Sequence, residues 1–174
     1  MPENNMHDFT HFHGKEKATA KVYATGQQRY EVDPNKRETN LVWSPPTGPV
    51  PELIIDYIHK ANDSAGWMYD LTELEGIQIA EYEPGGFFDW HGDIDFPRDD
   101  NSQRKISCSL QLSKADAYEG GDLLVETAGN EIFTMPRTQG TIILFPSIAK
   151  HKVTPVTAGK RYSAVGWMRG PAFR

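Results

Sequence analysis

The fold is decided by residues 106–146, ISCSLQLSKADAYEGGDLLVETAGNEIFTMPRTQGTIILFP. Short apolar runs alternate there with turns that contain glycine or proline, as in an all-β segment. In ISCSLQL (106–112) every second residue is apolar, which is typical of a strand with one buried face. TIILFP (141–146) is apolar throughout, which predicts a strand covered on both faces. The segment therefore predicts four strands, at 106–112, 122–127, 131–135 and 141–146.

Further elements are expected on both sides of this segment. Ile77 and Ile79 alternate with less apolar neighbours, and RYSAVGWM (161–168) closes the series of strands. Before them, SPPTGPVP (44–51) is a rigid connector, because proline removes backbone donors and disfavours helix in the residue before it. A helix is expected over about 50–62. These elements predict a mainly β protein with flanking helices (α+β), of the sandwich or jelly-roll kind.

The expected helix has clear signals at both ends. Pro51 suits a first helical turn, and Gly66 follows soon after the apolar pattern stops. Between them, apolar residues recur at helical spacing and predict one amphipathic face: Leu53, Ile54, Tyr57, Ile58 and Ala61.

The 174 residues fit a single domain, 1–174, in which residues 75–174 form the core and 1–20 a loosely ordered tail. The tail holds His7, His11 and His13, which we interpret as incidental. The net charge of -6 and the pI of about 5.5 argue against a nucleic-acid partner, which would call for clustered Lys and Arg.

The cellular address is expected to be the cytoplasm. Cys108 is the one cysteine, so an intrachain disulfide is impossible, and we expect it to be a small buried apolar residue. The first residues have no apolar run like that of a secretory signal. No stretch approaches the length of a membrane span.

Three residues form a candidate metal site. His91 and Asp93 are two apart in EYEPGGFFDWHGDID (81–95), so in extended backbone both side chains leave the same face. His151 follows a later strand. Two imidazoles and one carboxylate, with other positions open, are the facial triad of non-haem iron(II) oxygenases. An H-x-D tripeptide alone is weak evidence, and Asp95 is an alternative ligand.

Arg161 strengthens this interpretation. It lies at the start of the last expected strand, where it should share a face with Ser163, Val165 and Trp167. A buried guanidinium offers a planar, bidentate partner to a carboxylate, and the Ser163 hydroxyl could add a donor. The alternative is a local ion pair between Arg161 and an Asp or Glu.

The chain resembles the prolyl 4-hydroxylase-like branch of the 2-oxoglutarate oxygenases. The resemblance rests on these segments, in the family's order from about residue 77 to the end: YEPGGFFDWHGDID, RKISCSLQLS, YEGGDLLVE, GTIILFPSIAKHKVTPV and GKRYSAVGWMRG. It implies a double-stranded β-helix (jelly roll). It also implies iron(II), 2-oxoglutarate and O2 as cofactors, with ascorbate as a possible reductant.

The resemblance also implies roles for single residues. His91, Asp93 and His151 match the metal ligands. Arg161 and Tyr82 match the residues that hold the distal carboxylate of 2-oxoglutarate.

Three further matches have structural alternatives. Gln111 stands where some relatives place a second tyrosine, and Trp167 matches an aromatic residue near the iron. Arg104 resembles an arginine that contacts the substrate backbone. Gln111 and Trp167 could instead be core residues, and Arg104 a solvated charge.

The implied activity is hydroxylation of prolyl residues in a peptide or protein, with succinate and CO2 as products. Alternatives are the same chemistry on another side chain, a free amino acid or a small molecule, a binding module without activity, and a jelly roll that uses another metal. The loop DIDFPRDDNSQRK (93–105) is either a lid over the site or a plain connection. The sequence leaves the physiological substrate, the regiochemistry and the oligomeric state open.

Overall fold

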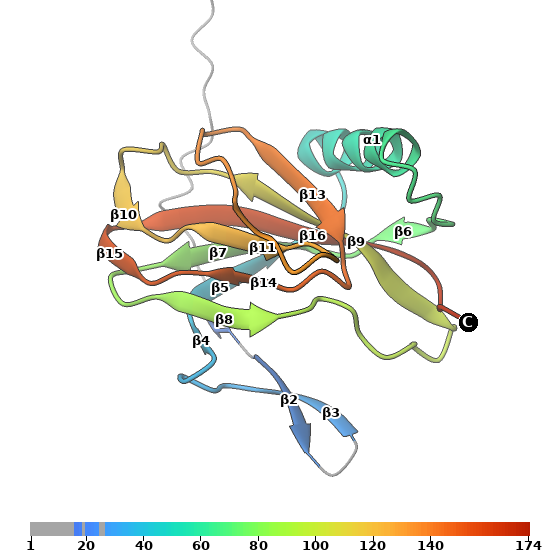
Figure 1. Cartoon of the computed structure of the whole chain (residues 1–174), viewed down its shortest axis with the longest axis horizontal. Coiled ribbons are helices and arrows are strands. Elements are labelled where there is room, and N and C mark those ends of the chain that lie inside the picture. Colours follow the sequence, from blue (N-terminus) through green and yellow to red (C-terminus); the bar gives the residue numbers. More distant parts are fainter. Residues whose placement is uncertain (1–15, 19, 25–26) are drawn as a thin grey trace, which may run out of the picture.

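The computed structural model describes residues 16–18, 20–24 and 27–174, which form two facing antiparallel sheets with one helix outside them (Figure 1). The larger sheet has the strand order β1-β5-β7-β16-β9-β13, and β6 pairs with the end of β16. Its strands are β1 (Glu16–Lys17), β5 (Asn40–Ser44), β6 (Glu73–Leu74), β7 (Ile77–Tyr82), β9 (Ser102–Gln111), β13 (Ile142–Pro146) and β16 (Arg161–Pro171).

The smaller sheet has the order β12-β11-β14-β8-β4. Its strands are β4 (Arg37–Glu38), β8 (Phe87–His91), β11 (Leu123–Glu126), β12 (Ile132–Thr134) and β14 (His151–Val153). Two further pairs stand apart from both sheets, β10 (Tyr118–Gly120) with β15 (Val156–Gly159), and β2 (Ala20–Ala24) with β3 (Gln27–Glu31). The β2–β3 hairpin projects from the body of the molecule (Figure 1).

Helix α1 (Pro49–Ser64) covers the outer face of the larger sheet. Ile54 and Ile58 are its fully buried apolar residues, and they pack with Ile106, Cys108 and other residues of the sheet. The buried face is narrower than the sequence predicts, because Leu53 and Tyr57 remain half exposed. The prediction for Cys108 is confirmed: its side chain is fully buried, and burial raises the pKa of its thiol to about 12.

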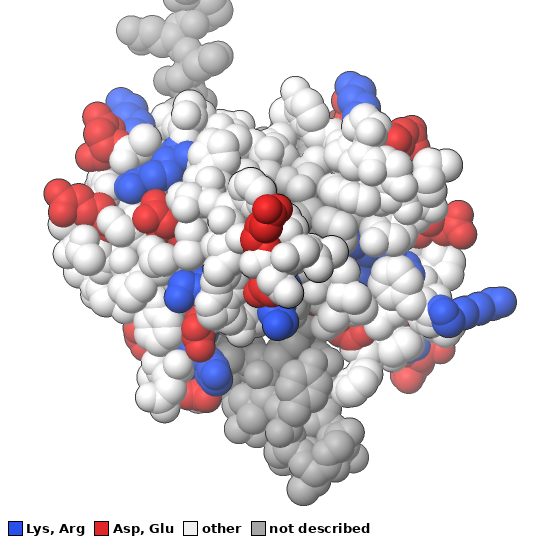
Figure 2. All heavy atoms as spheres, in the orientation of Figure 1, with Lys and Arg blue, Asp and Glu red and all other residues white. Residues whose placement is uncertain are grey.

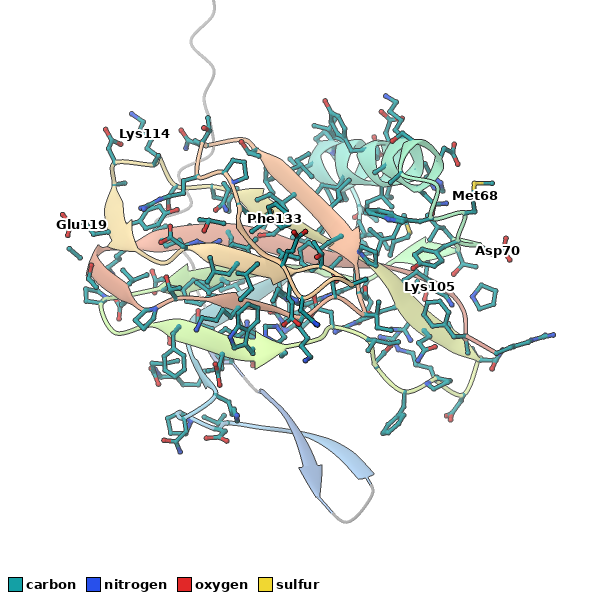
Figure 3. All side chains as sticks on the ribbon, in the orientation of Figure 1. Met68, Asp70, Lys105, Lys114, Glu119 and Phe133 are labelled. Atoms are coloured by element: carbon teal, nitrogen blue, oxygen red, sulfur yellow. The ribbon has the colours of Figure 1, made fainter. Side chains whose placement is uncertain are left out.

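A second core lies between the two sheets, where side chains from both fill the space (Figure 3). Ile143 and Phe145 of β13 point into it, whereas Ile142 and Leu144 pack on the α1 side. The prediction that 141–146 is covered on both faces is therefore confirmed. This second core packs the inward faces of the two sheets together, and the candidate site lies at this inner surface.

The expected strands are present, and the mainly β class with a jelly-roll arrangement is confirmed. The predicted strands at 77–80, 106–112, 122–127, 131–135, 141–146 and 161–168 correspond to β7, β9, β11, β12, β13 and β16. The sequence analysis assigned no strand before residue 75, yet β5 pairs with β7 and β4 with β8. Most of the expected loose tail, with His7, His11 and His13, lies outside the described residues. Glu16 and Lys17 form β1 beside β5.

The loop from Asp93 to β9 is tied to the larger sheet by buried charges. The Glu75 carboxylate accepts hydrogen bonds from Arg98, Arg104 and Arg169 at 2.7–3.0 Å. Asp95 accepts from the Arg169 guanidinium at 2.8 Å and from the Arg104 backbone N–H at 3.0 Å. These contacts favour a fixed connection over a lid, because opening the loop would separate the buried pair between Asp95 and Arg169.

We expect Glu75→Gln to lower the free energy of unfolding by about 3 kcal/mol, because it leaves buried guanidiniums without their shared anion. Burial alone would raise the pKa of Glu75, but the Arg104 and Arg169 guanidiniums hold it below its ordinary value of 4.5. The stabilisation is therefore complete above that pH and is lost as the pH falls through the lower, folded-state pKa. Urea unfolding at about pH 7 and about pH 3.5 should show the difference from wild type shrinking at the lower pH.

The matched control is Glu83→Gln, which removes an exposed carboxylate that pairs with Lys160 at 2.6 Å. An exposed pair of this kind contributes about 0–1 kcal/mol. An equal loss of stability in the two variants would show that the Glu75 cluster does not hold the loop.

On the face shown in Figure 2, positively and negatively charged side chains lie among one another. None of the helices formed by residues 16–18, 20–24 and 27–174 has the length and apolar character needed to cross a membrane.

Candidate active site

The two histidines of the candidate metal site meet across neighbouring strands. His91 ends β8 and pairs with His151, the first residue of β14, whereas Phe88 pairs with Val153. Between these two pairs β8 has two residues, Asp89 and Trp90, where β14 has one, Lys152, which is a β-bulge. Because pairing partners share a face of the sheet, the bulge turns both Phe88 and His91 inward. Both line the same cavity.

Asp93 completes the cluster just beyond β8. Its Oδ1 lies 3.6 Å from His91 Nε2, and its Oδ2 lies 3.3 Å from His151 Nε2. One ligand atom from each residue falls within 4.8 Å of the others, so the three could hold a metal ion. Asp95 is excluded from this cluster, because it is turned toward Arg169.

Backbone carbonyls set the orientation of both imidazoles. His91 Nδ1 lies 2.7 Å from the Asp89 carbonyl oxygen, and His151 Nδ1 lies 3.1 Å from that of Ala149. A carbonyl oxygen accepts, so in each ring Nδ1 carries the hydrogen and Nε2 carries the lone pair. Burial, and then the neighbouring His151, lowers the pKa of His91 to about 3, which keeps its lone pair available.

The Asp93 carboxylate is buried among groups that favour its charged form. The Ser107 hydroxyl donates to Oδ2 at 2.8 Å, and the Asp93 backbone N–H donates to the Ser147 carbonyl at 2.9 Å. Burial alone would raise the pKa of Asp93, but His151 and His91 hold it below its usual value. The Trp167 indole N–H also lowers the pKa of this carboxylate, although the two groups do not meet the geometry of a normal hydrogen bond. A neutral-imidazole and ionised-carboxylate donor set of this kind suits a divalent transition metal.

Arg161 lies in the wall of the same cavity and is 1% exposed. Its Nη1 donates to Ser163 Oγ and its Nη2 to Gln111 Oε1, both at 3.1 Å, and Nε has no hydrogen-bond partner among the described residues. In the part of the chain that the structure describes, Arg161 forms no ion pair, so the alternative of a local Asp or Glu partner is not observed. A buried guanidinium without a counter-ion is costly unless a ligand supplies one.

One cavity is lined by both the His-Asp-His cluster and the Arg161 guanidinium. Its empty space, counted together with the open solvent at its mouth, is about 440 Å³. Tyr82, Ser163 and Trp167 line it. Gln111 does not line it and instead supports the Arg161 guanidinium from behind.

Arg104 lies outside the cavity lining. Its guanidinium bonds Glu75 and stacks over the Trp167 ring, with Cζ 3.8 Å from the ring centroid. It is 9% exposed, so it is not the solvated charge that the sequence analysis gave as the alternative. Its contact with Trp167 connects the Glu75 cluster to the wall of the site.

Arg37, Phe88 and Phe145 are cavity residues that the sequence analysis missed. Arg37 comes from β4, outside the motif region. Phe88 is inside the quoted segment, but only the bulge in β8 turns it inward. Phe145 packs on His151 with centroids 4.7 Å apart, and an apolar run does not reveal which member meets a ligand.

The chain belongs to the 2OG-Fe(II) oxygenase superfamily, whose sequence model matches residues 77–169. Among curated proteins, a PKHD-type hydroxylase from Synechococcus sp. strain CC9605 is 35% identical over 98 residues, 56% of this chain and 43% of the relative. A PKHD-type hydroxylase from Shewanella oneidensis is 37% identical over 91 residues, 51% and 40% of the two chains. The matched region thus spans less than half the length of these relatives.

Solved structures of prolyl hydroxylases share the fold. A prolyl-4-hydroxylase from Pseudomonas putida aligns with a TM-score of 0.63 and 25% identity over 80% of this chain and 73% of that one. A viral collagen prolyl hydroxylase from Paramecium bursaria Chlorella virus-1, solved with 2OG, gives 0.61 and 23% over 78% and 80%. The superfamily uses iron(II), 2-oxoglutarate and O2, and the donor set described above fits the metal.

Proposed function

We propose that the protein is an iron(II)- and 2-oxoglutarate-dependent dioxygenase that hydroxylates prolyl residues in a peptide or protein. The observation that supports this chemistry is a cavity lined by both a candidate metal site and a candidate carboxylate site. The His-Asp-His cluster lines it together with the buried guanidinium of Arg161, which has no anionic partner in the described part of the chain. The likeness to the Pseudomonas putida prolyl-4-hydroxylase supports the prolyl substrate.

His91, Asp93 and His151 would hold the iron through two Nε2 atoms and one carboxylate. When bound, iron(II) with 2-oxoglutarate and O2 supplies the oxidant that converts a substrate C–H to C–OH, with succinate and CO2 as products. Three protein ligands leave the remaining coordination positions for small molecules.

Arg161 would bind the distal carboxylate of 2-oxoglutarate as a charge-assisted pair. Ser163 and Tyr82 line the cavity beside it, with the Arg161 Cζ 5.2 Å from the Tyr82 ring centroid. Gln111 would act through Arg161, because its side-chain oxygen fixes the orientation of the guanidinium. Trp167 would close the wall and exclude water, and Arg104 would reach a substrate only by exchanging its bond to Glu75.

The same chemistry on another side chain or a small molecule is the second candidate. The curated relatives are named PKHD-type hydroxylases and are matched over less than half of their length. A peptide partner is supported by the fold neighbour from Trichoplax adhaerens, a prolyl hydroxylase solved with a peptide fragment, at 21% identity and a TM-score of 0.58. A cytoplasmic address and ascorbate as reductant remain parts of this proposal.

The test measures succinate from 2-oxoglutarate with iron(II)-loaded protein on admission of air, with and without proline-rich peptides. The matched control peptides carry alanine at each proline. Succinate that proline peptides stimulate, together with one added oxygen atom on a prolyl residue, supports the proposal. Succinate formed without stimulation keeps the oxygenase and moves the substrate to the second candidate. Absence of metal-dependent turnover contradicts both.

A further inference from the structure

Three side chains from two strands form a stack at the edge of the metal cluster. The rings of Phe88 and His91 lie 3.5 Å apart between centroids and 15° from parallel. The Arg37 guanidinium lies over the Phe88 ring, with Cζ 4.4 Å from its centroid. Phe88 thus contacts an imidazole and a guanidinium, and all three residues line the cavity.

The chain builds this stack from local structure. Asp33 accepts hydrogen bonds from the backbone N–H groups of Lys36 and Arg37 through its carbonyl, and from that of Asn35 through its carboxylate. This turn delivers Arg37 into β4, where it pairs with Phe88 in register. Pairing partners in an antiparallel sheet share a face, so Arg37 follows Phe88 to the inside.

Arg37 is also fixed from a second direction. Its Nη2 donates to Gln78 Oε1 at 2.9 Å in the larger sheet. The guanidinium therefore spans from one sheet to the other and holds Phe88 in place. A desolvated cation over a ring face is among the stronger contacts an aromatic side chain makes.

His91 needs such support more than His151 does. Its side chain is 16% exposed, against 8% for His151. The hydrogen bond from Nδ1 to Asp89 fixes one edge of the His91 ring but leaves its tilt free. His151 meets Phe145 and His91 only at tilted angles of 56° and 54°, and its burial confines it.

We propose that Phe88, held by Arg37, is a positioning residue that sets the plane of the His91 imidazole and thereby the metal affinity of the site. The inference rests on the proposed function in taking His91 as a metal ligand. Groups that orient metal ligands typically contribute 10–100-fold to metal affinity.

The direction in which metal affinity changes when Arg37 is replaced tests this inference. A cation near a metal site repels the metal, so removal of the charge alone would tighten metal binding. If the stack is what matters, Arg37→Met weakens metal binding despite losing the repulsion. If Arg37 serves instead to bind substrate, the variant raises the KM for peptide and, with the repulsion removed, binds the metal more tightly than wild type.

The experiment titrates full-length apo-protein with Co(II) and follows the visible absorption of the bound ion, without turnover. We expect the Kd for Co(II) to rise about tenfold in Phe88→Leu and about fivefold in Arg37→Met. Phe88→Tyr keeps a ring that can stack on His91, so this variant should retain the wild-type Kd and spectrum. Circular dichroism of each apo-variant checks that it is folded.

Two matched controls lie next to the stack. Phe87→Leu changes the neighbouring residue of β8, which does not line the cavity, and Lys36→Met removes an exposed cation beside Arg37. Both should leave the Kd unchanged. An unchanged Kd in Phe88→Leu, or tighter binding in Arg37→Met, would overturn the inference and leave the proposed function standing. Wild-type protein that binds no Co(II) would overturn both.

Discussion

Asp93→Asn is expected to weaken iron(II) binding by more than about a hundredfold, beyond the usual effect of losing a group that merely supports a ligand. The change is nearly isosteric and keeps an acceptor for the Ser107 hydroxyl, so the fold should survive. It removes the one anionic donor of the cluster and leaves two neutral imidazoles. Anaerobic titration with iron(II) gives the affinity, and peptide-stimulated succinate should be lost in parallel.

Asp95→Asn is the control that separates the two candidate carboxylates. Asp95 accepts from Arg169 and from the Arg104 backbone, and it is absent from the metal cluster. We expect this variant to bind iron(II) like wild type while unfolding at a lower urea concentration. Loss of iron(II) in Asp95→Asn with retention in Asp93→Asn would reverse the assignment of the ligand.

Arg161→Met is expected to raise the Kd for 2-oxoglutarate by about a hundredfold to a thousandfold. The reason is that breaking a buried charge pair costs about 3–5 kcal/mol, and the lower part of that range, about 3–4 kcal/mol, corresponds to this change in Kd. The free protein should respond in the opposite direction. Because the guanidinium is buried and no described residue supplies a counter-ion, its replacement by an apolar side chain should leave the apo-protein at least as stable. Binding by isothermal titration to the metal-loaded protein, and thermal unfolding of the apo-protein, measure the two effects.

Arg137→Met is the matched control for that change. Arg137 pairs with the partly exposed Asp122 at 3.5 Å and does not line the cavity. Its loss should leave 2-oxoglutarate binding intact. If Arg161→Met bound 2-oxoglutarate normally but unfolded more readily, Arg161 would be a structural residue of β16.

Much of the architecture is predictable from local pattern. The alternation in ISCSLQL sets the two faces of β9, and the structure uses them differently. Ile106 and Cys108 pack with the residues under α1, whereas Ser107 and Gln111 reach Asp93 and Arg161. Period-two spacing reveals this division, and it places the site on the polar face.

The missing parts depend on contacts that no local pattern encodes. Arg37 enters the cavity because β4 pairs with β8, and its register partner Phe88 lies 51 residues further along the chain. Phe88 turns inward through a register shift that is invisible in the residue letters. The position of the Arg104 side chain was equally unpredictable, because its partner Glu75 lies outside both the 81–95 segment and the 93–105 loop. Long-range pairing decides all three.

The central place of β16 has a consequence for how the chain reaches its native state. β16 pairs with β7 on one side and β9 on the other, although it is synthesised well after both. Until it is inserted, β7 and β9 present open edges to the solvent, and such edges invite pairing with other chains. Closing the sheet brings together segments far apart in sequence, which slows folding. We therefore expect nascent or truncated chains without residues 161–171 to be aggregation-prone, and chaperone dependence to centre on this one insertion step.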